Sequence, residues 1–223
     1  MKKKFLSLMM AAAVVATTSV SAFAADNVID SADDQEAQSN VKITGNIQDE
    51  NGKDPVGTFK VTIPTAANFT VNNKGTVISG DLDIKNAGSQ AIDVYAYRFV
   101  DESNTDKINI VGEQQLDDSR IANEKNSTVA LKLTSSIGNG VAYLSSDSSK
   151  NGVYNQPDLI ADNAATGLGV KLLTLSKGTE QNPTSGKIRF EGKGGKSPIS
   201  AGKAISDDFT LTLKIKKADK QQK

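Results

Sequence analysis

The 223-residue chain contains no cysteine, no histidine and no tryptophan. Without cysteine there is no disulfide framework, thiol nucleophile, zinc ribbon or iron–sulfur cluster. Without histidine there is no imidazole for acid–base catalysis, for metal ligation or for a serine-hydrolase triad. Carboxylates are left as the acid–base groups, so the composition favours a binding or architectural protein over an enzyme.

The first 24 residues have the pattern of a secretory signal peptide. Lysines at positions 2–4 precede the apolar run Phe5–Ala16, and Ala22-Phe23-Ala24 supplies the small residues before a cleavage site. This run has 12 residues, whereas a membrane-spanning helix needs roughly 20. The chain ends without an apolar tail or a sorting signal. We therefore expect bacterial export of residues 25–223 to the extracellular space or cell surface, without a membrane span; an uncleaved N-terminal anchor is the alternative.

Charge is distributed unevenly along the exported chain. The full chain has 26 basic and 26 acidic residues. Removal of the three signal-peptide lysines leaves 23 basic residues, so the exported chain has a net charge of −3. Residues 25–40 carry five acids and no base, which predicts an extended acidic leader. Residues 218–223 form a basic tail, and the folded domain is expected over residues 41–217. Basic residues do not form a stripe with interleaved aromatics, so nucleic acid is not an expected partner.

Short segments of alternating apolar and polar residues fill the domain. In the last segment Phe209, Leu211, Leu213 and Ile215 point one way, while threonines and lysines point the other. About ten such segments, without a long amphipathic helix, predict an all-β fold, an antiparallel β-sandwich of immunoglobulin-like or jelly-roll type. The predicted strands are 41–47, 58–63, 69–71, 82–84, 92–100, 108–110, 128–134, 142–144, 170–175, 187–191 and 209–216.

The segment Ile92–Val100 is apolar on both faces, which predicts a central strand of a sheet. Tyr95, Tyr97 and Phe99 form an aromatic stripe on one of those faces. We interpret the stripe as a layer of the core, with a binding face as the alternative. Lys214 and Lys216, which alternate with apolar residues near the C-terminus, are interpreted as solvated lysines that protect a final edge strand.

One loop has the ligand spacing of a calcium site. Asp147, Ser149 and Asn151 stand at positions 1, 3 and 5, Gly152 permits a sharp turn at position 6, and Asp158 closes the loop at position 12. The loop differs from an EF-hand because it has aspartate rather than glutamate at position 12, a lysine inside it and no flanking helices. A polar loop without metal is the alternative interpretation. No other cofactor is expected.

Two further motifs do not predict a site. The stretch from Gly192 to Ser197 (GKGGKS) ends like a phosphate-binding loop, but Phe190 takes the place of the first glycine and no helix follows, so it predicts a flexible turn. A glycosidase needs two facing carboxylates, whereas neighbouring acids on a surface are usually solvated. The candidate pairs are Asp81/Asp83, Asp117/Asp118 and Asp207/Asp208. No catalytic residue is assigned.

The run Phe59–Phe69 (FKVTIPTAANF), the segment Gly80–Gly88 (GDLDIKNAG) and Ile92-Asp93-Val94 resemble a theme of secreted Firmicutes surface proteins. Together with the final strand, they are similar to immunoglobulin-like sandwiches of the WxL-like and camelysin/TasA-like groups. The chain lacks the Trp-x-Leu motifs that define WxL proteins, so peptidoglycan binding of that type is not implied. The resemblance implies a cell-surface, matrix or fibre role without catalytic residues.

These observations predict a secreted, non-enzymatic structural protein of the cell surface or extracellular matrix. We expect it to assemble with itself by strand addition, in which the acidic leader and the segment 41–47 pair with a neighbouring copy. Cell-wall polymers are the second class of expected partner, attracted by the basic tail. The alternative function is an extracellular glycan-binding or calcium-binding module.

Overall fold

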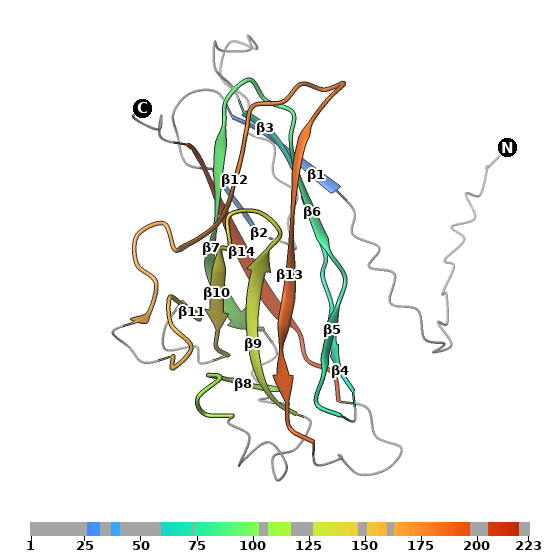
Figure 1. The fold of residues 1–223 in the computed structure, drawn as a ribbon, viewed down its shortest axis with the longest axis vertical. Helices are drawn as coiled ribbons and strands as arrows, with labels where there is room; N and C mark the ends of the chain where they lie inside the picture. The colour runs from blue at the N-terminus through green and yellow to red at the C-terminus, as the bar shows by residue number, and fades with distance from the viewer. Residues whose placement is uncertain are drawn as a thin grey trace, which may run out of the picture.

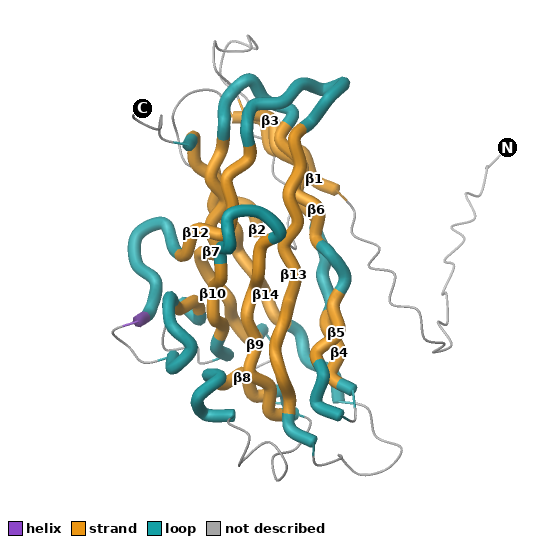
Figure 2. The backbone as a smooth tube through the Cα atoms, viewed as in Figure 1, coloured by secondary structure: helices purple, strands orange, loops and turns teal. Residues whose placement is uncertain are grey.

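The computed structural model describes residues 26–31, 37–40, 59–72, 74–102, 107–116, 127–146, 151–159, 163–196 and 205–218. The predicted signal peptide and the predicted strand 41–47 lie outside these residues. The described part of the chain is all-β, with two large sheets that face one another along the long axis of the molecule (Figures 1 and 2). The predicted all-β sandwich is therefore confirmed. No helix among the described residues is long and apolar enough to cross a membrane.

The larger sheet has the order β1-β3-β6-β13-β9-β10-β11, and β8 pairs with β9 in parallel. Its other pairings are antiparallel. In spatial order its strands are β1 (Asp26–Ser31), β3 (Phe59–Pro64), β6 (Leu82–Asn86), β13 (Thr184–Gly194), β9 (Thr128–Ser135), β10 (Val141–Leu144) and β11 (Val153–Tyr154), with β8 (Asn109–Val111) beside β9.

The smaller sheet has the order β12-β7-β14-β2 and is antiparallel. Its strands are β12 (Val170–Leu175), β7 (Ile92–Asp101), β14 (Phe209–Lys217) and β2 (Ala37–Asn40). A separate hairpin, β4 (Phe69–Val71) with β5 (Val77–Ser79), lies beside the lower part of β13 (Figure 1). The described residues contain four strands that the alternation did not predict: β1, β2, β5 and β11.

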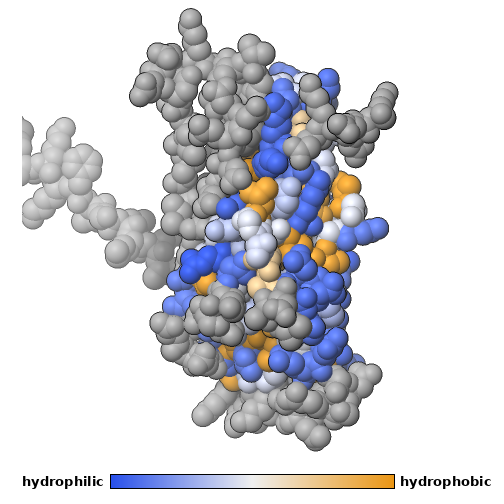
Figure 3. All heavy atoms as spheres, turned by 90° about the vertical axis from the view of Figure 1, so that its left-hand side faces the viewer, coloured by the Kyte–Doolittle hydropathy of each residue, from blue (hydrophilic) through white to orange (hydrophobic). Residues whose placement is uncertain are grey.

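Apolar side chains from both sheets form one core. Every second residue of β14 faces inward, and Leu211, Leu213 and Ile215 are buried there as predicted. From the larger sheet, Ile84 and Leu131 enter the same cluster. Figure 3 shows that the described surface on one side of the molecule is mainly hydrophilic, with small and separate hydrophobic areas. Burial of the alternating apolar residues therefore explains the two-layer arrangement.

A bulge in β7 divides the predicted aromatic stripe. Ala96 pairs with Leu213 and Arg98 pairs with Thr212, which leaves Tyr97 as the extra residue. The bulge lets Phe99 face the core on the same side as Ala96, and its side chain is buried. Tyr95 and Tyr97 are half-buried outside the core cluster. The core interpretation is right for Phe99 and wrong for the two tyrosines.

The interpretation of β14 as an edge strand with solvated lysines is also wrong. This strand pairs with β7 on one side and with β2 on the other. Lys214 is only 7% exposed, and its Nζ lies 3.6 Å from the centroid of the Tyr97 ring. The bulge that turns Tyr97 out of the core thus supplies an aromatic face for a buried ammonium group.

A buried asparagine joins the two sheets at one end of the sandwich. Asn86, at the end of β6, is fully buried. Its Nδ2 donates to the carbonyl oxygens of Gln90 (2.8 Å) and Ser176 (2.9 Å), and its Oδ1 accepts from the backbone N of Gly88 (2.9 Å). These bonds connect β6, the β6–β7 turn and the residue after β12. One side chain therefore satisfies three backbone groups that no strand pairing reaches.

We predict that Asn86→Ala lowers the free energy of unfolding by roughly 2–4 kcal/mol, because it removes three hydrogen bonds and leaves the buried backbone N of Gly88 without this partner. Urea denaturation followed by circular dichroism measures this change. Asn155→Ala, at an exposed asparagine, is the matched control and should have little effect. An equal loss in the two variants would contradict the structural role of Asn86.

Candidate functional site

The predicted calcium loop is described in part. Asp147 and Ser149 lie outside the described residues, whereas Asn151 and Asp158 lie within them. Asn151 Nδ2 donates to the Ala165 carbonyl oxygen (2.6 Å), and its Oδ1 accepts from the backbone N of Val153 (3.1 Å). Asp158 Oδ1 accepts from Asn163 Nδ2 (2.6 Å). Both side chains thus have partners in the fold, and calcium binding stays a prediction.

Gly152 of this loop is required by the backbone. Its φ is +70°, and a Cβ atom there would lie 1.9 Å from the carbonyl oxygen of Phe99. The backbone conformation therefore requires glycine at position 6 of the loop whether or not a metal binds. Within the described residues, no group of three or more acidic side chains is placed to hold a metal ion.

We predict that Asn151→Ala lowers the free energy of unfolding by roughly 1–3 kcal/mol, because it removes both hydrogen bonds of the side chain. The loss should be the same in a calcium chelator and in millimolar calcium, as measured by thermal and urea denaturation. A loss that occurs only with calcium would instead assign Asn151 to a metal site. Asp158→Asn, tested in the same way, gives the contribution of the loop's other described ligand candidate.

One acid in each of the two described candidate pairs has a partner in the fold. Asp81 forms an ion pair with Lys187 (3.0 Å) on the outer face of the larger sheet. Asp207 accepts hydrogen bonds from the backbone N of Ile108 (2.9 Å) and of Asp208 (3.2 Å). Asp117 and Asp118 lie outside the described residues. Asp81 thus links the start of β6 to β13, and Asp207 holds the backbone that leads into β8.

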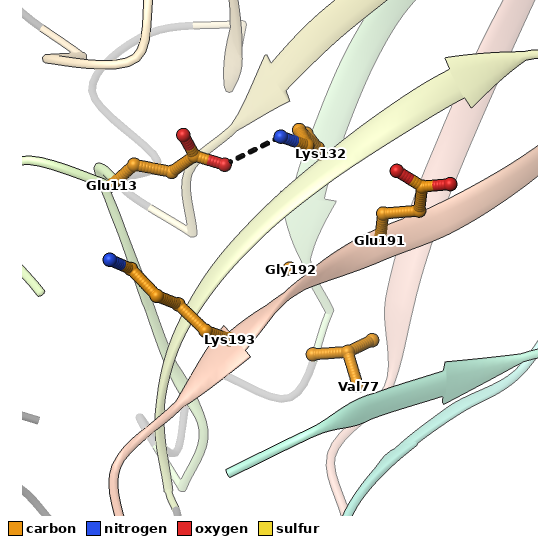
Figure 4. Close-up of a pocket in the computed structure, with 6 residues that line it drawn as sticks. All are labelled: Val77, Glu113, Lys132, Glu191, Gly192 and Lys193. Atoms are coloured by element: carbon orange, nitrogen blue, oxygen red, sulfur yellow. Dashed lines mark hydrogen bonds and ion pairs between the residues drawn. The ribbon is translucent and has the colours of Figure 1, made fainter.

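A charged hollow of about 400 Å³ lies on the outer face of the larger sheet (Figure 4). It is lined by Val77, Glu113, Lys132, Glu191, Gly192 and Lys193. Lys132 Nζ lies 2.8 Å from Glu113 Oε1, and a quarter of the lysine side chain is exposed. The hydrogen bond that Lys132 donates to Glu113 raises the pKa of Lys132, and burial opposes the shift. Glu191 pairs with Arg189 along the strand (2.7 Å).

We predict that Glu113→Gln lowers the free energy of unfolding by about 0.5–1 kcal/mol at pH 8, since it removes a half-buried ion pair. The pKa of Lys132 is raised in the folded state. The ion pair therefore stabilises the fold fully at pH values below the unfolded-state pKa of the lysine, and this stabilisation is lost as the pH rises through the folded-state pKa. The difference between wild type and variant should therefore hold from pH 7 to 9 and shrink above about 10.5.

Urea denaturation at pH 8 and pH 11 measures this difference. Glu180→Gln, at the exposed pair of Glu180 with Lys60 (2.8 Å), is the matched control and should leave stability unchanged at both values. A difference for Glu113→Gln that grows toward pH 11 would contradict the assignment.

An aromatic groove of about 450 Å³ lies between residues 65–70, which lead into β4, and residues 205–211, which lead into β14. Phe69 lies between two other rings, 5.7 Å from Phe190 and 6.1 Å from Phe209 between centroids. Phe209 stacks on Phe99 at 5.1 Å. The groove thus has an apolar floor from both sheets, and its rim carries Asn68, Asp207 and Asp208.

The acidic leader contributes an edge strand to each sheet. β1 pairs with β3 over six residues, from Asp26 opposite Pro64 to Ser31 opposite Phe59. β2 pairs with the second half of β14, where Asn40 lies opposite Thr212. In the described part of the chain, no strand pairs with Phe209–Leu211 on the side where β2 lies. The aromatic groove is lined by that half of β14.

Comparison of this chain with models of protein families, with curated proteins and with solved structures finds no match. The function must therefore be inferred from the chain's own geometry. Sequence reasoning missed the leader strands, the charged hollow and the aromatic groove. A signal for the hollow is present, because Arg189, Glu191 and Lys193 alternate with core residues and thus share the outer face of one strand.

Proposed function

We propose that residues 25–223 form a secreted, non-enzymatic structural protein of the cell surface or extracellular matrix that assembles with itself by strand addition. The observation that supports this proposal is the pairing of the leader: β1 and β2 form edge strands of both sheets. An edge strand at the end of a chain is held through backbone hydrogen bonds, which another copy of the same segment satisfies equally well.

Exchange of the leader between copies would produce a fibre. The donor segment lies at the edges of the sheets, whereas the acceptor is formed by β3 and β14 of the core. Donor and acceptor are different surfaces, so the contact between copies is heterologous. A heterologous contact that does not close on itself gives an open filament.

The aromatic groove supplies a place for apolar side chains of the donor. Beyond Asn40 the sequence continues with Val41 and Ile43, which lie outside the described residues. In the assembled fibre, these two side chains would occupy the aromatic groove beside Phe209–Leu211 of the next copy. Backbone pairing would then give affinity, and the alternating side chains would give register.

The absence of histidine and cysteine and the resemblance to secreted surface sandwiches support the non-enzymatic part of the proposal. Export rests on the signal-peptide pattern of residues 1–24. Glycan binding and calcium binding are the alternatives.

We predict that purified residues 25–223 form fibres in negative-stain electron microscopy and that residues 48–223 do not. Val28→Pro with Ile29→Pro should also prevent fibres, because consecutive prolines remove backbone donors at both alternating positions of β1. Asp26→Asn with Asp30→Asn is the matched control and should still assemble. Equal assembly by the truncated and full-length exported chains would rule out strand donation.

A truncated chain that fails to fold would also fail to assemble, so a second measurement separates the two causes. A synthetic peptide of residues 25–47 should bind the truncated chain with one-to-one stoichiometry and raise its melting temperature. A truncated chain that is folded, as judged by circular dichroism, but does not bind the peptide would contradict the proposal.

A further inference from the structure

Three lysines gather where the β4–β5 turn meets the end of β13. Thr76 forms an antiparallel bridge with Lys193, and the backbone N of Gly194 donates to the carbonyl oxygen of Gly75 (2.8 Å). Lys196 Cγ lies 3.4 Å from the position that a Cβ atom would take on Gly75. Lys74 directly precedes that glycine. The turn thus brings Lys74 into the neighbourhood of Lys193 and Lys196.

Neighbouring acids of this cluster are already paired. Within the described residues, no carboxylate forms an ion pair with Lys74, Lys193 or Lys196. Glu113 is bound to Lys132 and Glu191 to Arg189. Figure 4 shows Lys193 at the rim of the charged hollow, with its ammonium group on the side of Glu113. The backbones of three lysines without a carboxylate partner therefore meet at one place on a chain whose exported form carries a net negative charge.

Two glycines close the contact between the turn and the end of β13. Gly75 and Gly194 are buried, and a Cβ atom on Gly75 would lie 2.3 Å from the carbonyl oxygen of Gly194. The backbone N of Gly194 is used by Gly75, and that of Gly195 donates to the carbonyl oxygen of Thr128 (2.9 Å). The stretch does not therefore present these N–H groups to a compact phosphate as a nucleotide loop does. It offers positive charge along an open surface.

We propose that Lys74, Lys193 and Lys196 form a binding surface for a polymer that carries phosphate groups along its backbone. Lysine ammonium groups bind phosphate as point charges without fixed geometry. Separate phosphates of one extended polymer reach three lysines on an open surface, whereas a single phosphate reaches fewer of them. Leader pairing uses β3 and β14, whereas these lysines come from the β4–β5 turn and the end of β13, so this proposal goes beyond strand addition and does not depend on it.

Fluorescence anisotropy with labelled linear polyphosphate tests the proposal on residues 25–223. In Lys74→Ala with Lys193→Ala and Lys196→Ala, the affinity should fall at least tenfold. The matched control is Lys85→Ala with Lys107→Ala and Lys177→Ala, which removes the same charge elsewhere and should change the affinity less than threefold. Equal losses in the two variants would overturn the proposal, because the net charge would then explain the binding. Melting temperatures near that of the wild type verify that both variants fold.

Salt and competitor dependence give two further readouts. By analogy with single-stranded nucleic acid, three phosphate contacts predict a roughly tenfold or greater loss of affinity between 50 and 200 mM salt, and the triple variant should lose most of this dependence. Glycerol phosphate polymer should compete with polyphosphate, and polygalacturonate, a polymer of carboxylates, should compete poorly. Equal competition by polygalacturonate would overturn the assignment to phosphate. If the wild type does not bind polyphosphate, the proposal that these lysines form a binding surface is wrong.

Discussion

Apolar side chains from β7, β12 and β14 meet those from β6, β9 and β13 in a single layer, and the two sheets are positioned by the burial of that layer. Each buried side chain of the size of leucine or phenylalanine contributes about 1.5–3 kcal/mol when it leaves water. The strands therefore turn one face inward along their whole length. The alternation of inward and outward side chains is interrupted at Tyr97 in β7. A bulge there shifts the phase of the strand, so that Phe99 enters the core layer.

The same layer explains which parts of the fold the sequence predicts. Strands with one apolar face, such as β6 and β14, lie within a few residues of their predicted positions because their alternation is the cause of their burial. The bulge in β7 was not predicted, because Ile92–Val100 is apolar on both faces and either phase satisfies the pattern. Strand order was not predictable either, since it depends on contacts between residues that are far apart in the chain.

The leader strands escaped prediction for a different physical reason. Residues 26–31 (DNVIDS) have only two large apolar residues and residues 37–40 (AQSN) have none, so their sequence gives little sign of burial. Their pairing with β3 and β14 uses backbone groups, which are the same in every residue except proline. An edge strand can therefore form without an apolar face, and no periodicity marks it. The charged hollow was missed likewise, because its residues come from four separate segments of the chain.

The position of the leader at the chain terminus bears directly on assembly. Cleavage after Ala24, as the signal pattern predicts, would make Asp26, the first residue of β1, the second residue of the exported chain. A terminal strand leaves its edge without pulling a loop through the fold, whereas an internal strand such as β6 is tied at both ends. Before cleavage the apolar signal segment is attached to the same strand. Export would therefore place β1 close to a free chain end, from which it can pair either with its own sheet or with that of another copy.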